Sequence, residues 1–202
     1  MADITVSTDI DTFLQGADNA AARDSLGVIS YPYTTDFQSG TEQTRDLTSI
    51  ASSDGYYFNS SLTSVYVGSN VTSIGSVAFY NCSSLTSVTI GNSVTSIGIY
   101  AFSTCTSLTS ITIPDSVTSI GDVAFGYCTS LTSATIGNSV TSIGNDAFNG
   151  SSSLATINCL ATTAPTLGSN VFNNVAATDI HVPVGATGYG TTYGGLTVIF
   201  DL

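Results

Sequence analysis

The chain has 202 residues, of which 42% are hydrophobic and only 8% are charged. Its formal net charge is −12, and Arg23 and Arg45 are its only Lys or Arg residues. Binding to nucleic acid or to an anionic membrane needs cations that neutralise phosphate, so this charge argues against both classes of partner. The hydrophobic content is high enough for a packed core, so the composition also argues against a disordered chain.

The start of the chain shows no targeting signal. Residues 1–13, MADITVSTDIDTF, lack the basic start and the apolar stretch of a signal peptide. No run of residues approaches the length of an apolar membrane-spanning helix. We therefore expect the protein to fold in the cytoplasm in which it is made, with no membrane insertion.

Residues 1–30 do not share the pattern of the rest of the chain and are predicted to form a separate segment with a short helix. Asp18 is a suitable N-cap for a helix that continues to Leu26, and Gly27 is a suitable stop. The candidate anchor residues of this segment are Ile10, Phe13, Leu14, Ala20, Ala21 and Leu26. Residues 31–45, YPYTTDFQSGTEQTR, are predicted to be a linker.

The string at residues 8–28, TDIDTFLQGADNAAARDSLGV, resembles a segment near the start of bacteriophage tail-fibre and other virion proteins. The residues that carry the resemblance are Phe13, Leu14, Ala17, Asp18, Ala20, Ala21, Ala22, Arg23, Leu26 and Gly27. The resemblance implies a segment that anchors the chain to a virus particle and joins copies of it into an oligomer. The other interpretation is a helical cap that seals the end of the following domain.

From residue 46 to residue 202 the sequence is predicted to form one repeat domain. The string VTSIG begins at Val71, Val94, Val117 and Val140, so each step is 23 residues long. Three further columns keep this step: the leucines from Leu62 to Leu154, the Ala-Phe pairs from Ala78-Phe79 to Ala147-Phe148, and the cysteines Cys82, Cys105 and Cys128. Chance does not produce four columns with one common period.

One unit, LTSVTIGNSVTSIGIYAFSTCTS, predicts two short extended segments joined by turns. In the first segment Val88 and Ile90 point to one side, whereas Ser87 and Thr89 point to the other. A single turn of this kind cannot bury its own apolar side, but stacked turns bury it against one another. The sequence therefore predicts a mainly β repeat solenoid of 23-residue units with turns or short helical pieces between the strands.

The unit resembles the BspA-like, or Treponema pallidum type, leucine-rich repeat, whose motif is C-x-x-L-x-x-I-x-I-P-x-x-V-x-x-I-G-x-x-A-F. The matching residues are Cys105, Leu108, Ile111, Ile113, Pro114, Val117, Ile120, Gly121, Ala124 and Phe125. The resemblance implies a right-handed leucine-rich-repeat solenoid, a fold that serves many partners. Pro114 fills the proline position only once, because the equivalent residues are Gly68, Gly91 and Gly137.

Both ends of the repeat depart from its pattern, as capping units do. Residues 47–51, LTSIA, read as a degenerate VTSIG that is one residue out of step. Val171-Phe172 takes the place of the Ala-Phe pair. Residues 193–200, YGGLTVIF, predict a final strand that covers the open end of the stack.

The reactive residue types are predicted to have structural roles. One cysteine per turn gives a row of sulfur atoms rather than the tetrahedron that a metal ion needs, so these cysteines and Cys159 are predicted to be core thiols. His181, the single histidine, shares a strand face with Asp179, but no activated nucleophile accompanies them. We therefore predict no catalytic residues, no metal site and no cofactor, and hence a protein that is not an enzyme.

The predicted binding face is the outward side of the strand ladder. Its residues are Tyr66, Ser87, Thr89, Ser110, Thr112, Ser133, Thr135, Asn158 and His181. This uncharged surface suits hydrogen bonding to a glycan or to a polar protein surface. The other interpretation is that Ser and Thr only favour strands and keep the surface soluble. Tyr80, Tyr100 and Tyr127 form a second candidate contact area.

The sequence leads to three functional hypotheses. The first is a bacteriophage virion component, such as a tail fibre, an appendage or a capsid decoration, that is assembled in the host cytoplasm. It would be a homo-oligomer, bound to other virion proteins through residues 1–30, with the solenoid displayed for adhesion or for bracing the shell. The alternative is a cell-surface BspA-like adhesin of a bacterium that binds a host protein or glycan. An ice-binding surface is disfavoured, because a curved sheet of mixed Ser and Thr fits flat ice poorly.

Overall fold

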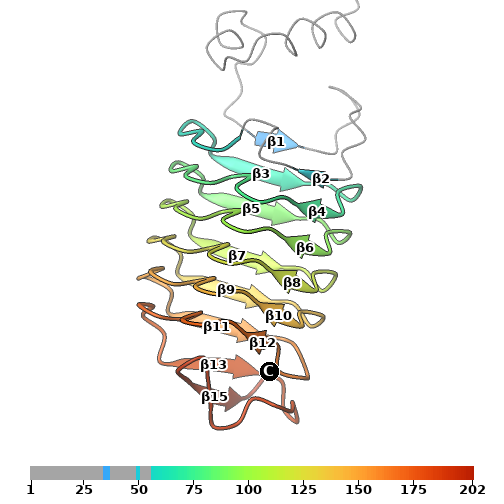
Figure 1. The fold of residues 1–202 in the computed structure, drawn as a ribbon, viewed down its shortest axis with the longest axis vertical. Helices are drawn as coiled ribbons and strands as arrows, with labels where there is room; N and C mark the ends of the chain where they lie inside the picture. Colours follow the sequence, from blue (N-terminus) through green and yellow to red (C-terminus); the bar gives the residue numbers. More distant parts are fainter. Residues whose placement is uncertain (1–33, 37–48, 51–55) are drawn as a thin grey trace, which may run out of the picture.

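The structure is a stack of turns in which each turn corresponds to one sequence repeat (Figure 1). It is a computed structural model that describes residues 34–36, 49–50 and 56–202, with side chains described from residue 56 onward. The described residues form strands, turns and bends and no helix, so the predicted mainly β solenoid is confirmed, whereas the predicted helical pieces between its strands do not occur. Residues 1–30, with their predicted helix and anchor residues, lie outside the described residues.

The first side of the stack is built from four-residue strands that lie parallel to one another, followed by the final strand β15. These strands are β3 (Ser64–Val67), β5 (Ser87–Ile90), β7 (Ser110–Ile113), β9 (Ser133–Ile136), β11 (Thr156–Cys159) and β13 (Asp179–Val182). Their register follows the sequence repeat, because Ser110 pairs with Ser133 and Asn158 pairs with His181. Alternate residues point inward, so Ile111 and Ile113 are buried while Thr112 is exposed.

The second side is a six-stranded parallel sheet of two-residue strands. They are β2 (Ser49–Ile50), β4 (Ser73–Ile74), β6 (Ser96–Ile97), β8 (Ser119–Ile120), β10 (Ser142–Ile143) and β12 (Thr166–Leu167). Ser49 pairs with Ser73, one residue more than the usual step of the repeat. The sequence 47–51 is thus a degenerate repeat unit that is one residue out of step, as predicted.

Strand β1 (Thr34–Asp36) pairs in parallel with β3, so that Thr34 lies opposite Ser64. It lies inside residues 31–45, which the sequence predicts to be a linker. An added strand at this place satisfies the N–H and C=O groups on the outer edge of β3. The wider division into residues 1–30, 31–45 and 46–202 stays a prediction.

The third side of the stack carries the Ala-Phe pairs and is held together by backbone hydrogen bonds between turns. The N–H groups of Tyr100, Phe102 and Thr104 donate to carbonyl oxygens of the next turn at 2.8–2.9 Å. Alternate N–H groups point along the stack because two residues of most turns have a positive φ, as at Tyr100 (56°) and Thr104 (62°). The aromatic rings that this side sends inward stack on one another, with centroid separations of 5.1, 5.3, 5.3 and 5.7 Å from Phe79 to Phe172.

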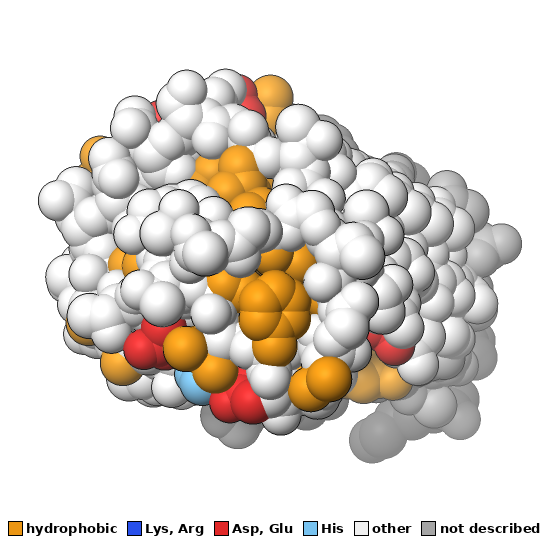
Figure 2. Space-filling model, turned by 90° about the horizontal axis from the view of Figure 1, so that it is seen from below, with side chains coloured by type: hydrophobic (Ala, Val, Ile, Leu, Met, Phe, Trp, Pro, Cys, Tyr) orange, Lys and Arg blue, Asp and Glu red, His pale blue; other side chains and the backbone are white. Residues whose placement is uncertain are grey.

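The far end of the stack is closed by a hairpin of β14 (Thr192–Tyr193) and β15 (Leu196–Phe200). β15 pairs in parallel with β13 and antiparallel with β14, so the predicted final strand is confirmed. Buried tyrosines fix this cap, because Tyr189 and Tyr193 donate to the carbonyl oxygens of Ala161 and Pro165 at 2.7 and 2.6 Å. Figure 2 shows this end, where apolar side chains remain visible between the polar loops.

A ladder of buried thiols connects successive turns. The Sγ atoms of Cys82, Cys105 and Cys128 donate to carbonyl oxygens of the preceding turn at 2.9, 3.2 and 3.2 Å. In the next turn Ser151 takes the cysteine position, and its hydroxyl donates to the carbonyl of Phe125 at 2.8 Å. Burial raises the pKa of the Cys82 thiol to about 11 and that of Cys128 to about 12, so these thiols stay protonated and unreactive. The predicted role of the cysteines as core residues is confirmed.

The ladder predicts different outcomes for two substitutions of Cys105. In Cys105→Ser the hydroxyl keeps the bond to the Phe79 carbonyl, as Ser151 does, so we expect a free energy of unfolding within about 1 kcal/mol of the parent. In Cys105→Val the Phe79 carbonyl loses the thiol donor and keeps the N–H of Cys82 at 3.3 Å, and we expect a loss of about 1–2 kcal/mol. Urea unfolding followed by circular dichroism measures both, and equal stability of the two variants would contradict a hydrogen-bonding role for the ladder.

Candidate functional site

The outward residues of the long strands form one continuous surface, which we call the hydroxyl face. Its members are the nine residues that alternation predicted: Tyr66, Ser87, Thr89, Ser110, Thr112, Ser133, Thr135, Asn158 and His181. The residues on β5 and β7 are exposed, and those on β9 and β13 are half-buried. Strand pairing places Thr112 beside Thr135 and Asn158 beside His181, so the face is ordered by the register of the strands.

Not every hydroxyl of the solenoid is available to a partner. Two flanking columns of threonine use their hydroxyls within the fold: Thr86 and Thr132 donate to carbonyls of the preceding turn at 2.9 and 3.0 Å, and Thr118 does so at 3.1 Å. By contrast, six hydroxyls of the face form no side-chain hydrogen bond with any described residue; they belong to Ser87, Thr89, Ser110, Thr112, Ser133 and Thr135. These hydroxyls can therefore donate to and accept from an external ligand.

An open hollow of about 830 Å³ runs along the edge where β5, β7 and β9 end. Thr89, Thr112 and Thr135 of the hydroxyl face line it, and Ile113 and Pro114 supply apolar surface. The hollow thus combines free hydroxyls with apolar surface and one acidic residue, Asp115. It was not predicted, because the repeat alone gives no reason for one edge of the stack to open.

Pro114 explains why the stack opens there. Two turns further on, the N–H of Leu160 donates to the carbonyl of Ile136 at 2.8 Å, and Pro114 holds the equivalent position without an N–H group. β5 and β7 accordingly belong to separate described sheets, and the hydrogen bond from the Thr109 N–H to the Thr86 carbonyl is long, at 3.4 Å. Val88, which alternation predicts to be inward, is only half-buried at this break.

The hydroxyl face is uncharged until its last strands, where a charged cluster begins. His181 Nδ1 lies 2.9 Å from Asp201 Oδ1, and His181 Nε2 lies 3.2 Å from Asp179 Oδ1. The hydrogen bond with Asp201 is the main reason that the pKa of His181 is raised above its ordinary value. Asp179 was noticed in the sequence, whereas Asp201 was missed because it reaches His181 only through the pairing of β13 with β15.

The chemistry of the described residues gives no catalytic arrangement. His181 is held between two carboxylates, and no serine or cysteine nucleophile is bonded to it. Within the same residues, no group of three or more His, Cys, Asp and Glu side chains is arranged to hold a metal ion. The described part of the chain also contains no helix that is long and apolar enough to pass through a bilayer.

Fold and face together define the class of protein: a leucine-rich-repeat solenoid, which is typically a non-enzymatic scaffold for interactions. The model of the BspA type leucine-rich repeat region matches residues 48–185 in six copies. The chain therefore belongs to the BspA type leucine-rich repeat family. No curated protein matches the sequence.

Several solved structures resemble the chain, among them the following three. A leucine-rich cell surface protein from Faecalibacterium prausnitzii is 42% identical, with a TM-score of 0.53 over 62% of this chain and 34% of that protein. The T. pallidum leucine-rich repeat protein is 25% identical, with a TM-score of 0.54 over 70% of this chain and 74% of that one. The pneumococcal vaccine antigen PcpA is 25% identical, with a TM-score of 0.56 over 62% and 31%. This chain thus spans about a third of the first and third of these structures.

The charged cluster predicts that stability decreases with rising pH. Because the folded pKa of His181 is raised, its stabilising contribution is complete below the ordinary value of 6.5 and is lost as the pH rises through the raised pKa. We expect a loss of less than about 1 kcal/mol, since the pair is exposed to solvent. Urea unfolding on either side of this range measures it, with His181→Gln as the control. A pH dependence that persists in His181→Gln would contradict the assignment.

Proposed function

We propose that this chain is a non-enzymatic interaction module displayed on a bacterial surface, where it binds an external ligand through the hydroxyl face. The observation that carries the proposal is the set of free hydroxyls on the outward sides of β5, β7 and β9. Support for surface display comes from the similarity to a leucine-rich cell surface protein and to a pneumococcal vaccine antigen.

The chemistry of the face favours an extended neutral glycan. A hydroxyl both donates and accepts, so a ladder of hydroxyls complements a ligand that is itself covered in hydroxyls. Neighbouring strands are about 4.8 Å apart, which presents equivalent groups at regular intervals to a long ligand rather than to a compact one. The hollow beside Thr89, Thr112 and Thr135 adds the apolar contact that fixes one position along the ladder. A polar surface of a host protein is the second kind of ligand that this face fits.

The test removes three hydroxyls without changing the shape of the face. In the triple variant Thr89→Val, Thr112→Val and Thr135→Val, we expect binding on an array of neutral glycans and host matrix proteins to weaken about tenfold or more. Valine is similar in size and favours strands, so the free energy of unfolding should stay within about 1 kcal/mol of the parent.

The matched control is the double variant Thr95→Val and Thr118→Val, whose hydroxyls donate to backbone carbonyls on another side of the stack. It should lose stability by about 1–2 kcal/mol and keep its binding. Unchanged binding by the triple variant would show that the hydroxyls serve only solubility and strand formation. Surface display is tested separately, by labelling intact source cells with an antibody against the solenoid.

A second candidate function, a bacteriophage virion component, is favoured by the string at residues 8–28. If this segment is an anchor, deletion of residues 1–30 should leave a folded chain whose mass, measured by light scattering, falls to that of a monomer and which no longer attaches to virus particles. If the segment is a cap, the same deletion should unfold the first turns. A deletion variant that keeps its oligomeric state and its glycan binding would leave the virion hypothesis without its main support.

A further inference from the structure

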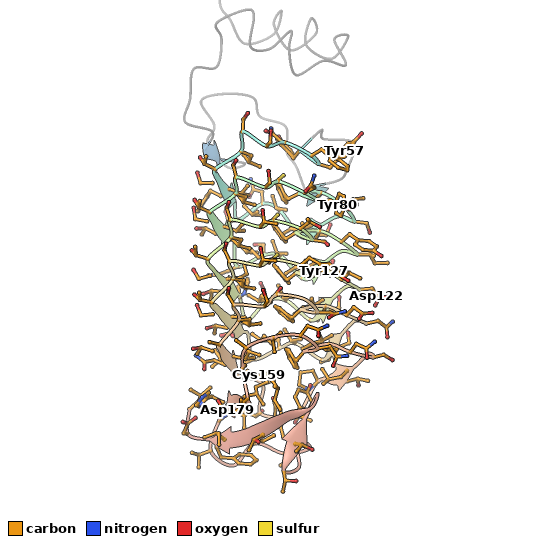
Figure 3. The ribbon with its side chains drawn as sticks, turned by 90° about the vertical axis from the view of Figure 1, so that its left-hand side faces the viewer. Tyr57, Tyr80, Asp122, Tyr127, Cys159 and Asp179 are labelled. Atoms are coloured by element: carbon orange, nitrogen blue, oxygen red, sulfur yellow. The ribbon has the colours of Figure 1, made fainter. Side chains whose placement is uncertain are left out.

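The third side of the stack carries a row of solvent-exposed aromatic residues, which we call the aromatic strip: Tyr57, Phe58, Tyr80, Tyr100 and Tyr127. Four of these side chains, those of Tyr57, Phe58, Tyr100 and Tyr127, are 43–59% exposed. The rings form a chain of edge contacts, at 5.8 Å between Tyr57 and Phe58, 5.2 Å between Phe58 and Tyr80, and 6.2 Å between Tyr80 and Tyr100. Figure 3 shows labelled tyrosines on the side away from the long strands, opposite Asp179.

The backbone at these positions does not favour aromatic residues. Phe58, Tyr100 and Tyr127 have φ values of 59°, 56° and 58°, a conformation that Gly, Asn and Asp adopt with less strain. Other turns place Asn81, Asp146, Gly150, Asn170 and Asn174 at equivalent positions, but also Val77, Thr104 and Val123. The positive φ is thus a property of the repeat, and what distinguishes the aromatic residues is that their rings lie on the surface.

The ring of Tyr127 is held in place by the next turn. A Cβ atom on Gly150 would lie 2.7 Å from Cδ1 of Tyr127, so only glycine leaves room for the ring against this turn. The backbone N–H of Tyr127 also donates to the carbonyl of Asn149 at 2.8 Å. One face of the ring is thus packed on the solenoid while the side chain stays 52% exposed, which fixes the surface that it offers to a ligand.

Two aspartates lie close to the strip along the chain. The backbone carbonyl of Asp122 accepts a hydrogen bond from the N–H of Tyr100 at 2.9 Å, and the carboxylate of Asp122 accepts from Asn145 of the next turn. The carboxylate of Asp146 accepts from the side chain of Asn149, whose carbonyl bonds to the N–H of Tyr127. Residues 56–202 contain no Lys or Arg, so nothing in this range neutralises these groups. Positive charge on a ligand therefore complements this surface.

We infer that the aromatic strip, with Asp122 and Asp146, binds a basic segment of a partner protein. Lys or Arg side chains of the partner lie over the tyrosine faces, where the ring quadrupole attracts a cation, and their charges pair with the two carboxylates. This surface is separate from the hydroxyl face, so one module has two partners of different chemistry. If the aromatic strip does not bind a basic segment, the proposal that the hydroxyl face binds a glycan is unaffected.

The experiment measures binding of a fluorescent peptide of alternating Arg and Gly residues to the full chain by fluorescence anisotropy, with a Gln-Gly peptide as the uncharged probe. The principal variant is Tyr100→Asn with Tyr127→Asn, which places at each position a residue type that tolerates a positive φ. We expect affinity for the Arg-Gly peptide to fall about tenfold. The urea midpoint should equal or exceed that of the parent, so a loss of binding cannot come from unfolding.

Two charge variants separate a specific site from attraction to an acidic protein. Asp122→Asn with Asp146→Asn should weaken binding about fivefold or more. Asp115→Asn with Asp179→Asn changes the net charge equally at other places and should leave the affinity within about twofold, because salt screens distant charges. Equal losses for the two pairs, or unchanged binding by the tyrosine variant, would overturn the inference. Tyrosine-dependent binding of neutral oligosaccharides without binding of the Arg-Gly peptide would overturn it as well, by assigning the strip to a glycan.

Discussion

The structure depends on one constraint: each turn must place its backbone and its buried side chains in register with the turns on either side. A single turn has no core of its own, so the apolar residues are shielded only by their equivalents in neighbouring turns. The stacked phenylalanine rings, the thiol ladder and the parallel pairing of strands from successive turns all follow from this requirement. Ser151 shows how specific this requirement is. It replaces the cysteine of its turn, and its hydroxyl still donates to a carbonyl of the preceding turn.

Because the register between turns constrains which residues can be buried, only the outward side chains are free to vary for binding. The hydroxyl face and the aromatic strip occupy different sides of the same stack and differ in chemistry. On the first, small uncharged side chains stand on strands whose backbone they suit. On the second, three aromatic residues have a positive φ, which Asn and Gly adopt with less strain. Two aspartates lie nearby, and residues 56–202 contain no Lys or Arg to pair with them. The contrast explains why we assign the two surfaces to ligands of different classes.

The ends of the stack need their own solution, since the last turn has no neighbour to bury its apolar side. At the far end the Tyr189 and Tyr193 rings fill the core and their hydroxyls bond to carbonyls of the preceding turn. β15 adds the last strand, and the bond between His181 and Asp201 attaches its end to β13. At the near end β1 covers β3.

The sequence by itself determined the repeat, its register and the direction of each strand residue, because a period of 23 residues forces equivalent residues into columns and alternation then separates inside from outside. It also indicated the final strand and the degenerate first unit. Only the tertiary structure decided the features that depend on contacts between residues at different positions of the repeat. These are the partnership of His181 with Asp201, the hollow beside Pro114, the half-buried state of Val88, and the ring contacts along the aromatic strip. A column pattern describes equivalent residues, whereas these features join residues from different columns, and their distances are set only when the chain closes on itself.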